Sequence, residues 1–578
     1  MMARRQFDQE ENRLEYGHLL FPEPDYDLDF AVGMTYSLDM EALLGVPVSL
    51  GMLEDLDGSA AQNPFFLLEA IRKSSDDLAI FCNADGIKLP RNIRPVYALL
   101  ENSIFPVALG RKSNFHPKVW IIRYKSRYAP PMVKVIVLSR NLTFDRSLDI
   151  AAEMTGFVEN ASNEAHRPLA DLLTFVSSYA PDAKRKRIRA LARDMLKIPE
   201  FDCGEQYEQY RFLPFGIPKY HNKAESLLTG ANSLIVVSPF LTDSVVTKLA
   251  ETPQQKVLIT RSGSVTLKSW ESFQEIYVPR EALLNDEVLE EADAPDASRR
   301  DLHAKIYFKT DRTGNYLYLG SLNASANAFY HNVEFLLELK FKPYYASFHS
   351  VLKDLVPDKN CPFEQLEAPP TEPAEKSEEE SMSSLADVVY ALGTAAVEQR
   401  GERYAVTLTC APLERSAEIA PLYRKGMFRP IQEEMLFEQI LLKELSEFYI
   451  IRRGTAYALV KVETAGIPTE ERDNAIYNEV VGSKSGFLAY VAFLLADNYT
   501  EASLEQHDLQ TLLEQAGGDA SAPVPAALYE RLLQTAAEQP ERLDAVARVM
   551  EKLDPELVDP VFRDLIGTFR SAVGRRKH

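Results

Sequence analysis

The chain has 578 residues, 46% of them apolar, so it can bury large hydrophobic cores and should form about three or four domain-sized units. The net charge of -21 excludes a protein that coats nucleic acid indiscriminately, because such binding depends on clustered Lys and Arg. Local basic clusters can still contact phosphates.

The spacing of the cysteines and the length of the apolar runs indicate the cellular compartment. The four cysteines are widely spaced and form no Cys-x-x-Cys pair: Cys82, Cys203, Cys361 and Cys410. This spacing predicts neither a disulfide framework nor a zinc cluster, and it favours a reducing, cytoplasmic location. Residues 1–15 are charged, and the longest apolar run, 486–496, is about half the length that spans a bilayer. We therefore expect no signal peptide, no membrane span and no membrane partner.

The first part of the chain alternates between β-branched and amphipathic runs. We expect strands at 26–36 and 78–83, and helices at 40–53, 64–73 and 97–101. Such alternation is typical of a sheet covered by helices.

A strand carrying two functional side chains follows. Residues 119–122 are β-branched and aromatic, and residues two apart in an extended chain point to one side, so His116 and Lys118 share a face. A second apolar run ends in Ser139-Arg-Asn141, where the outer two residues again lie two apart. A hairpin would bring both pairs to one place.

A basic segment at 184–197 is compatible with a helix. The sequence leaves two interpretations open: a solvated surface helix that joins two lobes, or a rail for the phosphate backbone. In the second interpretation, Arg185, Arg187 and Arg189 bind the substrate.

The strand and helix alternation then repeats. We expect helices at 224–228 and 243–251, and strands at 233–239, 256–261 and 275–278. These elements predict a second lobe of the same layered kind.

The side-chain pattern around His116 recurs in this second lobe. His303-Ala-Lys305 opens an apolar run, and after a turn the next run ends in Gly-Ser321-Leu-Asn323. The chain therefore contains an internal repeat of a whole constellation of side chains.

Each copy also has a later acid. Glu153 lies twelve residues after Asn141, and Glu334 lies eleven residues after Asn323. A third His-x-Lys, at His221, has neither a following strand nor a Ser-x-Asn, so it serves as an internal control. Two complete copies are difficult to reach by chance.

The composition changes after residue 345, and 364–384 is rich in Pro, Glu and Ser, which predicts a linker. Beyond it we expect a strand, a hairpin and then mostly helices, at 404–410, 448–452 with 456–463, 474–499 and several pieces between 503 and 572. We find no catalytic constellation in this region.

The sequence thus predicts an α/β fold with four parts. They are a first lobe at 1–200, a second lobe at 201–350, an acidic Pro/Glu/Ser linker at 351–385, and a C-terminal α+β, mainly helical, accessory or partner-binding domain at 386–578. The two lobes would meet at their hairpins and form one site on a pseudo-twofold axis.

The duplicated motif resembles the phospholipase D superfamily, whose signature is HxK, then GSxN and a later Glu, given twice per active site. The resemblance covers about residues 25 to 345, and it implies two phospholipase D-like lobes. Many members carry an Asp five positions after the Lys, where this chain has Arg123 and Thr310, and Leu138 replaces the motif Gly in the first copy. Tyrosyl-DNA phosphodiesterases and some restriction-type nucleases also lack that Asp, so the resemblance points toward nucleic-acid phosphodiesters.

Hydrolysis of a phosphodiester without metal needs a nucleophile, an acid for the leaving oxygen, and cations for the phosphoryl oxygens. The resemblance implies that His116 is the nucleophile that forms a phosphohistidine and that His303 is the acid. It also assigns the supporting side chains: Lys118, Lys305, Asn141 and Asn323 to the nonbridging oxygens, Ser139 and Ser321 to their support, and Glu153 and Glu334 to the histidine tautomers. No metal and no cofactor are expected.

Three function classes remain open. The first is a metal-independent phosphodiesterase, most simply a nuclease that cleaves DNA, in a bacterial restriction or antiphage system by analogy. The second is a non-catalytic nucleic-acid-binding or scaffold subunit that works with a helicase or ATPase through the C-terminal domain. The third is a phospholipase, which the missing export signal disfavours.

Overall fold

The computed structural model describes residues 19–51, 64–110, 112–143, 147–160, 162–221, 224–280, 302–359, 361–370, 385–495 and 526–574. The expectations for residues 1–15, for 371–384 of the linker and for any helix between 503 and 525 lie outside these residues. Within the described ranges, no helix combines the length and the apolar character that crossing a bilayer requires.

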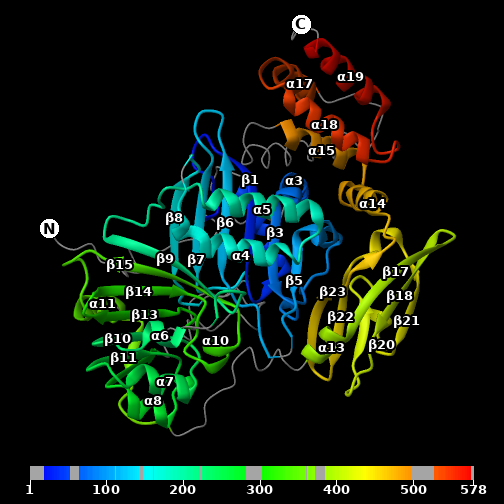
Figure 1. Ribbon diagram of the computed structural model, residues 1–578. Helices are drawn as coiled ribbons and strands as arrows, with labels where there is room; N and C mark the ends of the chain where they lie inside the picture. Colours follow the sequence, from blue (N-terminus) through cyan, green and yellow to red (C-terminus); the bar gives the residue numbers. More distant parts are fainter. Residues whose placement is uncertain are drawn as a thin grey trace.

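A six-stranded sheet organises the first part of the chain (Figure 1). Its strands are rich in Val, Ile and aromatic residues, which favour extended chain. The order is β5-β3-β1-β6-β7-β8, with the first three strands parallel and the others antiparallel. The strands are β1 (Asp27–Met34), β3 (Leu78–Asn83), β5 (Ile104–Val107), β6 (Val119–Lys125), β7 (Met132–Leu138) and β8 (Ala151–Phe157).

A second sheet repeats this arrangement with eight strands. Its central six, β12-β11-β10-β13-β14-β15, have the order and strand directions of the first sheet, and β16 and β9 extend the two edges. The strands are β9 (Tyr207–Phe215), β10 (Ser233–Val237), β11 (Gln255–Ile259), β12 (Glu275–Pro279), β13 (Ile306–Asp311), β14 (Gly314–Gly320), β15 (Glu334–Phe341) and β16 (Phe363–Gln365).

Helices cover both sheets, as the alternation predicted. On the first sheet, α2 and α3 cover one face, and α4 and α5 lie across the other (Figure 1). On the second sheet, α6, α7, α8 and α10 cover one face and α11 packs on the other. The helices are α2 (Met40–Gly51), α3 (Pro64–Ser74), α4 (Arg167–Ser177), α5 (Asp182–Met195), α6 (Ala224–Leu228), α7 (Asp243–Ala250), α8 (Leu267–Ser272), α10 (Ala326–Tyr330) and α11 (Phe348–Leu355).

Within the described ranges, 3-10 helices connect these elements at η2 (Ser75–Asp77), η3 (Pro95–Ser103), η4 (Glu164–His166) and η5 (Ser262–Ser264). The helix expected at 97–101 is therefore the 3-10 helix η3.

The two sheets share one hydrophobic core. Alternate side chains of each strand point to opposite faces, so Ile121 and Val135 of the first sheet enter the same buried cluster as Ile306 and Leu319 of the second. Because this cluster is continuous, the two repeats form one packed body with their hairpins on either side of it.

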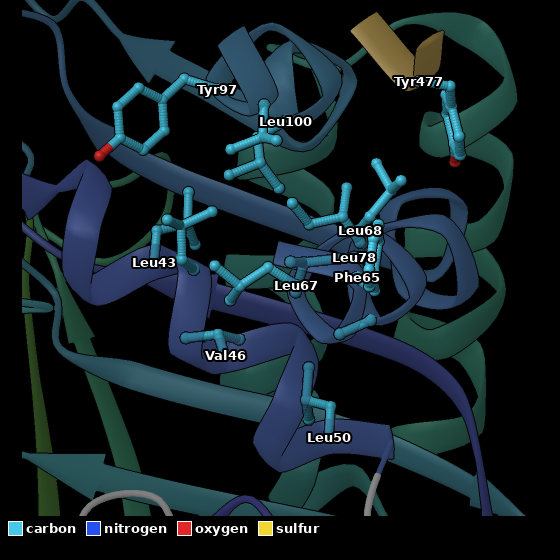
Figure 2. Close-up of a cluster of buried hydrophobic side chains, with 14 of the residues drawn as sticks. Leu43, Val46, Leu50, Phe65, Leu67, Leu68, Leu78, Tyr97, Leu100 and Tyr477 are labelled. Carbon is cyan, nitrogen blue, oxygen red and sulfur yellow. The ribbon is translucent and has the colours of Figure 1, made fainter. Parts of the chain in front are cut away.

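The opposite face of the first sheet carries a second cluster (Figure 2). In it, Leu43 and Leu50 of α2 lie beside Phe65 and Leu68 of α3, and the cluster also includes Tyr477 from the C-terminal region. The C-terminal region therefore contributes to the core of the first lobe.

The C-terminal region begins with two small sheets. One has the order β21-β18-β17-β24, and the other has the order β2-β4-β23-β22-β19-β20. The strands are β17 (Leu392–Arg400), β18 (Arg403–Cys410), β19 (Glu418–Pro421), β20 (Arg429–Pro430), β21 (Glu434–Ile440), β22 (Phe448–Arg453), β23 (Ala456–Lys461) and β24 (Thr464–Ala465), with β2 (Leu38–Asp39) and β4 (Ile87–Lys88) from the first lobe.

Helices complete the C-terminal region. The helix expected at 474–499 is divided, because Gly482 adopts a left-handed conformation with φ of 67° that ends the first helix. The helical elements are α13 (Ala386–Ala391), η7 (Lys425–Met427), η8 (Leu442–Glu444), α14 (Thr469–Val481), α15 (Lys484–Leu495), α17 (Ala526–Glu538), α18 (Glu541–Lys552) and α19 (Pro560–Gly574).

Two predicted boundaries need correction. The linker expected at 351–385 begins too early, because α11 and β16 belong to the second lobe and β16 pairs with β12. The domain expected at 386–578 also shares a sheet with the first lobe, where Leu459 of β23 pairs with Ile87 of β4. Sequence periodicity alone missed two-residue strands such as β2 and β4.

A buried ion pair joins the C-terminal region to the first lobe. Arg472 of α14 donates to Glu101 of η3 over 2.6 Å, and Ser446 and the Glu447 backbone donate to the other carboxylate oxygen over 2.6 and 2.9 Å. Removing one partner of a buried pair costs about 3–5 kcal/mol, so this contact fixes the two regions together.

Candidate active site

The two predicted hairpins form and place the motif residues at equivalent positions. In the first, β6 pairs with β7 and the Leu138 N–H donates to the Lys118 carbonyl over 2.9 Å. In the second, β13 pairs with β14, with Ile306 opposite Leu319. Each Ser-x-Asn therefore begins beside the start of the strand that follows its own His-x-Lys.

The two repeats then exchange backbone hydrogen bonds at their histidines. The His116 N–H donates to the Val333 carbonyl over 2.9 Å, and the His303 and Ala304 N–H groups donate to the Leu148 carbonyl, also over 2.9 Å. Each histidine is thus anchored to the other repeat. This reciprocal exchange supplies the pseudo-twofold relation that the motif duplication predicts.

His116 is held at both ring nitrogens. Its Nδ1 lies 2.9 Å from Glu334 Oε2, and its Nε2 lies 3.0 Å from Lys118 Nζ. Because an ammonium group only donates, Nε2 accepts from Lys118 and the ring proton sits on Nδ1, donated to Glu334. This tautomer leaves a lone pair on Nε2, as a nucleophile requires.

Glu334 is fully buried and receives several donors. Ser321 Oγ donates to the carboxylate oxygen that His116 contacts, and Asn332 donates to the other oxygen over 3.2 Å. Burial raises the pKa of Glu334 to about 8, although the charge of Lys118 and the hydrogen bonds from Ser321 and Asn332 pull it the other way. The Glu334 carboxyl group therefore changes its protonation state near neutral pH.

His303 has different surroundings. Its Nδ1 is buried and has no hydrogen-bond partner among the described residues, while Lys305 donates to the His303 carbonyl over 2.6 Å. Burial lowers the pKa of His303 well below its usual value, and the charges of Lys305, Arg261, Lys118 and Lys88 lower it further. Burial and these charges thus disfavour the imidazolium form of His303.

The two motif asparagines are buried. The Ser37 N–H donates to Asn141 Oδ1 over 3.3 Å, which leaves the amide NH2 of Asn141 as a donor for a phosphoryl oxygen. Asn323 Oδ1 is buried and has no hydrogen-bond partner in the described part of the chain. The NH2 group of each amide is the donor that can bind an oxyanion, whereas Oδ1 only accepts.

The structure does not bring Glu153 to the histidines, which corrects the sequence assignment. Glu153 lies in β8 opposite Ile136, and its carboxylate lies 3.3 Å from Lys134 Nζ. Its side chain is 33% exposed, whereas Glu334 is fully buried. Glu153 therefore belongs to a partly exposed ion pair outside the site.

Asp149 occupies the position that Glu153 was expected to hold. Ser139 Oγ donates to Asp149 over 3.0 Å and accepts from the next backbone N–H over 2.9 Å. Ser321 donates to Glu334 and accepts from the next backbone N–H, also over 2.9 Å. The two acids are therefore equivalent, with Asp149 one methylene shorter. The similar spacing of Glu153 and Glu334 from their asparagines, twelve and eleven residues, concealed this.

The contacts of the basic helix α5 favour the first of its two interpretations, a surface helix that joins two lobes. Arg185 donates to Asp182 over 2.7 Å and to backbone carbonyls at the end of α4. Arg187 donates to Asp77 and to a β1 carbonyl, each over 2.6 Å. Arg189 is exposed and donates to a Ser hydroxyl over 3.3 Å. These contacts hold α5 against its neighbours, and the assignment of the three arginines to substrate binding stays a prediction.

Other residues of the site carry no sequence signal. The ring of Tyr36 lies 5.1 Å from the His116 ring, and Lys118 Nζ lies 5.9 Å from its centroid. Asn83 Oδ1 accepts from the Phe115 N–H over 2.7 Å and so fixes the residue before the histidine. Neither lies near a motif, and only the fold brings them together. Within the described ranges, no group of three or more His, Cys, Asp or Glu is placed to hold a metal ion.

Comparison with known proteins gave similarity to solved structures only. No protein-family model matches the chain. No curated protein matches it either. Yeast tyrosyl-DNA phosphodiesterase is similar with a TM-score of 0.35 and 10% identity over 58% of this chain and 88% of that one. Phosphatidylserine synthase from Haemophilus influenzae has a TM-score of 0.33 and 14% identity over 62% of this chain and 87% of that one. Polyphosphate kinase from Porphyromonas gingivalis has a TM-score of 0.31 and 10% identity, over 57% of this chain and 42% of that one.

Proposed function

We propose that this protein is a metal-independent phosphodiesterase that cleaves DNA through a phosphohistidine at His116. The main support is the hydrogen-bonded series Glu334–His116–Lys118. In it, His116 Nδ1 donates to the Glu334 carboxylate and His116 Nε2 keeps its lone pair. A carboxylate that holds the distal nitrogen makes the other nitrogen a better nucleophile.

In the first step, His116 Nε2 attacks phosphorus, a P–N bond forms and the bond to the leaving oxygen breaks. The imidazolium of His303 gives its proton to that oxygen. Lys118 and Lys305, with the amides of Asn141 and Asn323, neutralise the charge on the nonbridging oxygens. Lys118 must leave His116 to do this, and the incoming phosphate supplies a better acceptor for it.

In the second step, the now neutral His303 takes a proton from a water molecule, and that water attacks phosphorus. The P–N bond breaks and its electron pair returns to His116 Nε2. The proton on His303 is restored, so the cycle closes without a further acid or base.

The protonation states of His303 and Glu334 explain why the charge of the substrate matters. The pKa of His303 is lowered by burial and by nearby cations, and the pKa of Glu334 is raised by burial. A phosphodiester brings one negative charge between the two lysines and offsets their effect on His303. Binding of the anion thus favours the protonated form that the first step needs.

The test is cleavage of labelled single- and double-stranded DNA, RNA and phosphatidylcholine vesicles, each with excess EDTA. We expect DNA cleavage that survives EDTA. Loss of all activity in EDTA with recovery in Mg²⁺ would reject the mechanism, and cleavage of vesicles alone would reject the substrate class.

A non-catalytic nucleic-acid-binding subunit is the alternative. It predicts that His116→Ala binds DNA as the unaltered protein does and that neither protein cleaves. The buried, oriented His116 and Glu334 support the catalytic proposal, because a binding module has no use for a buried carboxylate at an imidazole.

A further inference from the structure

Two buried residues with a hydroxyl group occupy equivalent positions in the two repeats. Thr35 directly follows β1, and its N–H donates to the Phe81 carbonyl over 2.9 Å. Ser238 directly follows β10, and its N–H donates to the Ile259 carbonyl over 3.0 Å. Because β1 pairs with β6 and β10 pairs with β13, each hydroxyl stands at the end of the strand beside the one that follows the His-x-Lys.

Each hydroxyl group makes the same two hydrogen bonds. Thr35 Oγ1 accepts from the Leu142 N–H over 3.0 Å and donates to the carbonyl two residues later over 2.8 Å. Ser238 Oγ accepts from the Ala324 N–H over 2.9 Å and donates to the carbonyl two residues later, also over 2.8 Å. A hydroxyl can donate and accept at the same time, which a methyl group in its place cannot.

The hydroxyl is the feature that the two segments share. Residues 35–37 are Thr-Tyr-Ser, residues 238–240 are Ser-Pro-Phe, and the N–H donors belong to a leucine in one repeat and an alanine in the other. A general similarity of the two segments therefore does not explain the matched contacts. They indicate a task that needs a hydroxyl in both repeats.

Both N–H donors belong to the residue that follows a motif asparagine. The Leu142 N–H lies in the same planar peptide group as the Cα of Asn141, and the Ala324 N–H lies in that of Asn323. A hydrogen bond to this N–H fixes the peptide plane against the end of β1 or β10. It therefore also fixes the Cα atom from which the asparagine side chain extends.

In the first repeat the hydroxyl also acts on the amide. Thr35 donates to the Ser37 carbonyl, and the Ser37 N–H donates to Asn141 Oδ1 over 3.3 Å. In the second repeat, Asn323 Oδ1 has no hydrogen-bond partner within the described ranges. Thr35 is thus linked to Asn141 through both the backbone and the amide, whereas the link from Ser238 to Asn323 runs through the backbone.

A purely structural role of these hydroxyls has a different consequence. A buried N–H needs an acceptor, and a hydroxyl that only satisfies this need stabilises the fold. Its loss would lower the free energy of unfolding, with no preference for one asparagine over the other. Positioning of an amide, in contrast, links each hydroxyl to the asparagine of its own repeat.

We propose that Thr35 and Ser238 are positioning residues that hold the amide NH2 groups of Asn141 and Asn323 toward the nonbridging oxygens of the substrate. These roles rest on the proposed function, which assigns both amides to those oxygens. Thr35 has the larger effect of the two, because it holds both the backbone and the amide of its asparagine.

The experiment measures the binding of orthovanadate by calorimetry in EDTA, so it requires no cleavage. Orthovanadate can adopt the five-coordinate geometry of a phosphorus atom under attack. Thr35→Val keeps the shape of the side chain without its hydroxyl and should weaken binding about tenfold, and Ser238→Ala should weaken it about threefold. Thr35→Ser restores the hydroxyl and should bind as tightly as the unaltered protein.

Double-variant cycles separate positioning from stability. Thr35→Val should add nothing to the loss in Asn141→Ala, but it should keep its full effect of about tenfold in Asn323→Ala. Ser238→Ala should show the opposite selectivity, with no further loss in Asn323→Ala and a full effect in Asn141→Ala. A hydroxyl with a structural role alone would not couple to one asparagine.

Ser103→Ala is the matched control. It removes a buried hydroxyl of the same lobe that donates to the Ser75 carbonyl over 2.9 Å, and it should leave orthovanadate binding unchanged. Equal effects of Thr35→Val in the two asparagine variants would overturn the proposal, and so would weak binding by Thr35→Ser. If Thr35→Val does not fold, Ser238→Ala and its two cycles give the same test in the other repeat.

Cleavage of bis(nitrophenyl) phosphate in EDTA, measured on the same preparations, distinguishes this proposal from the proposed function. A protein with selective coupling that cleaves nothing retains the positioning roles and rejects the proposed function. Cleavage without selective coupling retains the function and rejects the positioning roles. A protein that neither binds orthovanadate nor cleaves the ester rejects both.

Discussion

The His116 and His303 halves of the site have nearly the same backbone and different chemistry. In the first half the Leu142 N–H donates to Thr35 Oγ1 over 3.0 Å, and in the second the Ala324 N–H donates to Ser238 Oγ over 2.9 Å. Yet His116 has a buried glutamate at Nδ1, whereas His303 Nδ1 has no hydrogen-bond partner among the described residues. The duplicated fold places the two histidines at equivalent positions, and the groups around each histidine determine its proposed role.

The largest effect expected from this asymmetry is in the two histidine variants. With a nitrophenyl phosphodiester, His116→Ala should release no phenol, because it lacks the nucleophile. His303→Ala should release one burst and stall, because a good leaving group needs no acid but water still needs a base. Mass spectrometry should place the phosphoryl group on the peptide that contains His116.

An adduct on the His303 peptide, obtained from His116→Ala, would exchange the two roles. With DNA, whose leaving group is poor, His303→Ala should lose about 10²–10⁴-fold in rate. Absence of any adduct under every condition would count against covalent catalysis.

The next effect concerns the two acids. Glu334→Gln should lower kcat by about 10–100-fold, because the amide no longer accepts the Nδ1 proton as a charged partner. Asp149→Asn should cost less, since Asp149 accepts from Ser139 and His303 Nδ1 has no hydrogen-bond partner among the described residues. Glu153→Gln is the matched control and should keep the original rate. Equal losses in Glu334→Gln and Asp149→Asn would remove the asymmetry between the halves.

The pH dependence of kcat/KM should also reflect the difference between the two halves of the site. The productive form has Glu334 ionised and His303 protonated, although the pKa of Glu334 is raised to about 8 and that of His303 is lowered well below 6.5. This form contains one proton, so the rate should fall above about pH 8, when that proton leaves, and again below the pKa of His303, when a second one binds.

Glu334→Gln tests the origin of the upper limb. Without a titrating group at position 334, the remaining proton is that of His303, so the decline should begin well below pH 6.5. An upper limb that stays near pH 8 in Glu334→Gln would assign it to another group.

The smallest effect on activity is expected outside the site. Because Arg185 and Arg187 bind carboxylates and backbone carbonyls of their own lobe, replacing Arg185, Arg187 and Arg189 by Ala should leave the salt dependence of DNA binding unchanged. The free energy of unfolding should fall by about 1–3 kcal/mol, measured by urea denaturation. A flatter salt dependence of DNA binding in this triple variant would favour α5 as a phosphate rail. The first lobe would then have a phosphate-binding helix in addition to its half of the site.

Local patterns predicted much of the fold. Strand β3 was predicted at 78–83 and helix α6 at 224–228, and both are confirmed, because β-branched runs and amphipathic spacing report local backbone preference. Both hairpins were predicted from turn residues between apolar runs and are confirmed as β6–β7 and β13–β14.

The acid of the first repeat could not be predicted from spacing. Asp149 lies eight residues after Asn141, whereas Glu334 lies eleven residues after Asn323, because the two connections differ in length. The equivalence emerges only from the hydrogen bonds to the serines. Strands as short as β2 and β4 are likewise defined by their partners in space, and two residues show no period of their own.

The cross-repeat contacts also fix when, during synthesis, the protein becomes complete. His116 emerges from the ribosome 218 residues before Glu334, and Glu101 emerges 371 residues before Arg472. A nascent chain that ends within the second lobe therefore holds a histidine without its carboxylate and a first lobe without part of its core. The proposed site is therefore incomplete until Glu334 has been synthesised, and the ion pair that joins the C-terminal region to the first lobe forms only after Arg472.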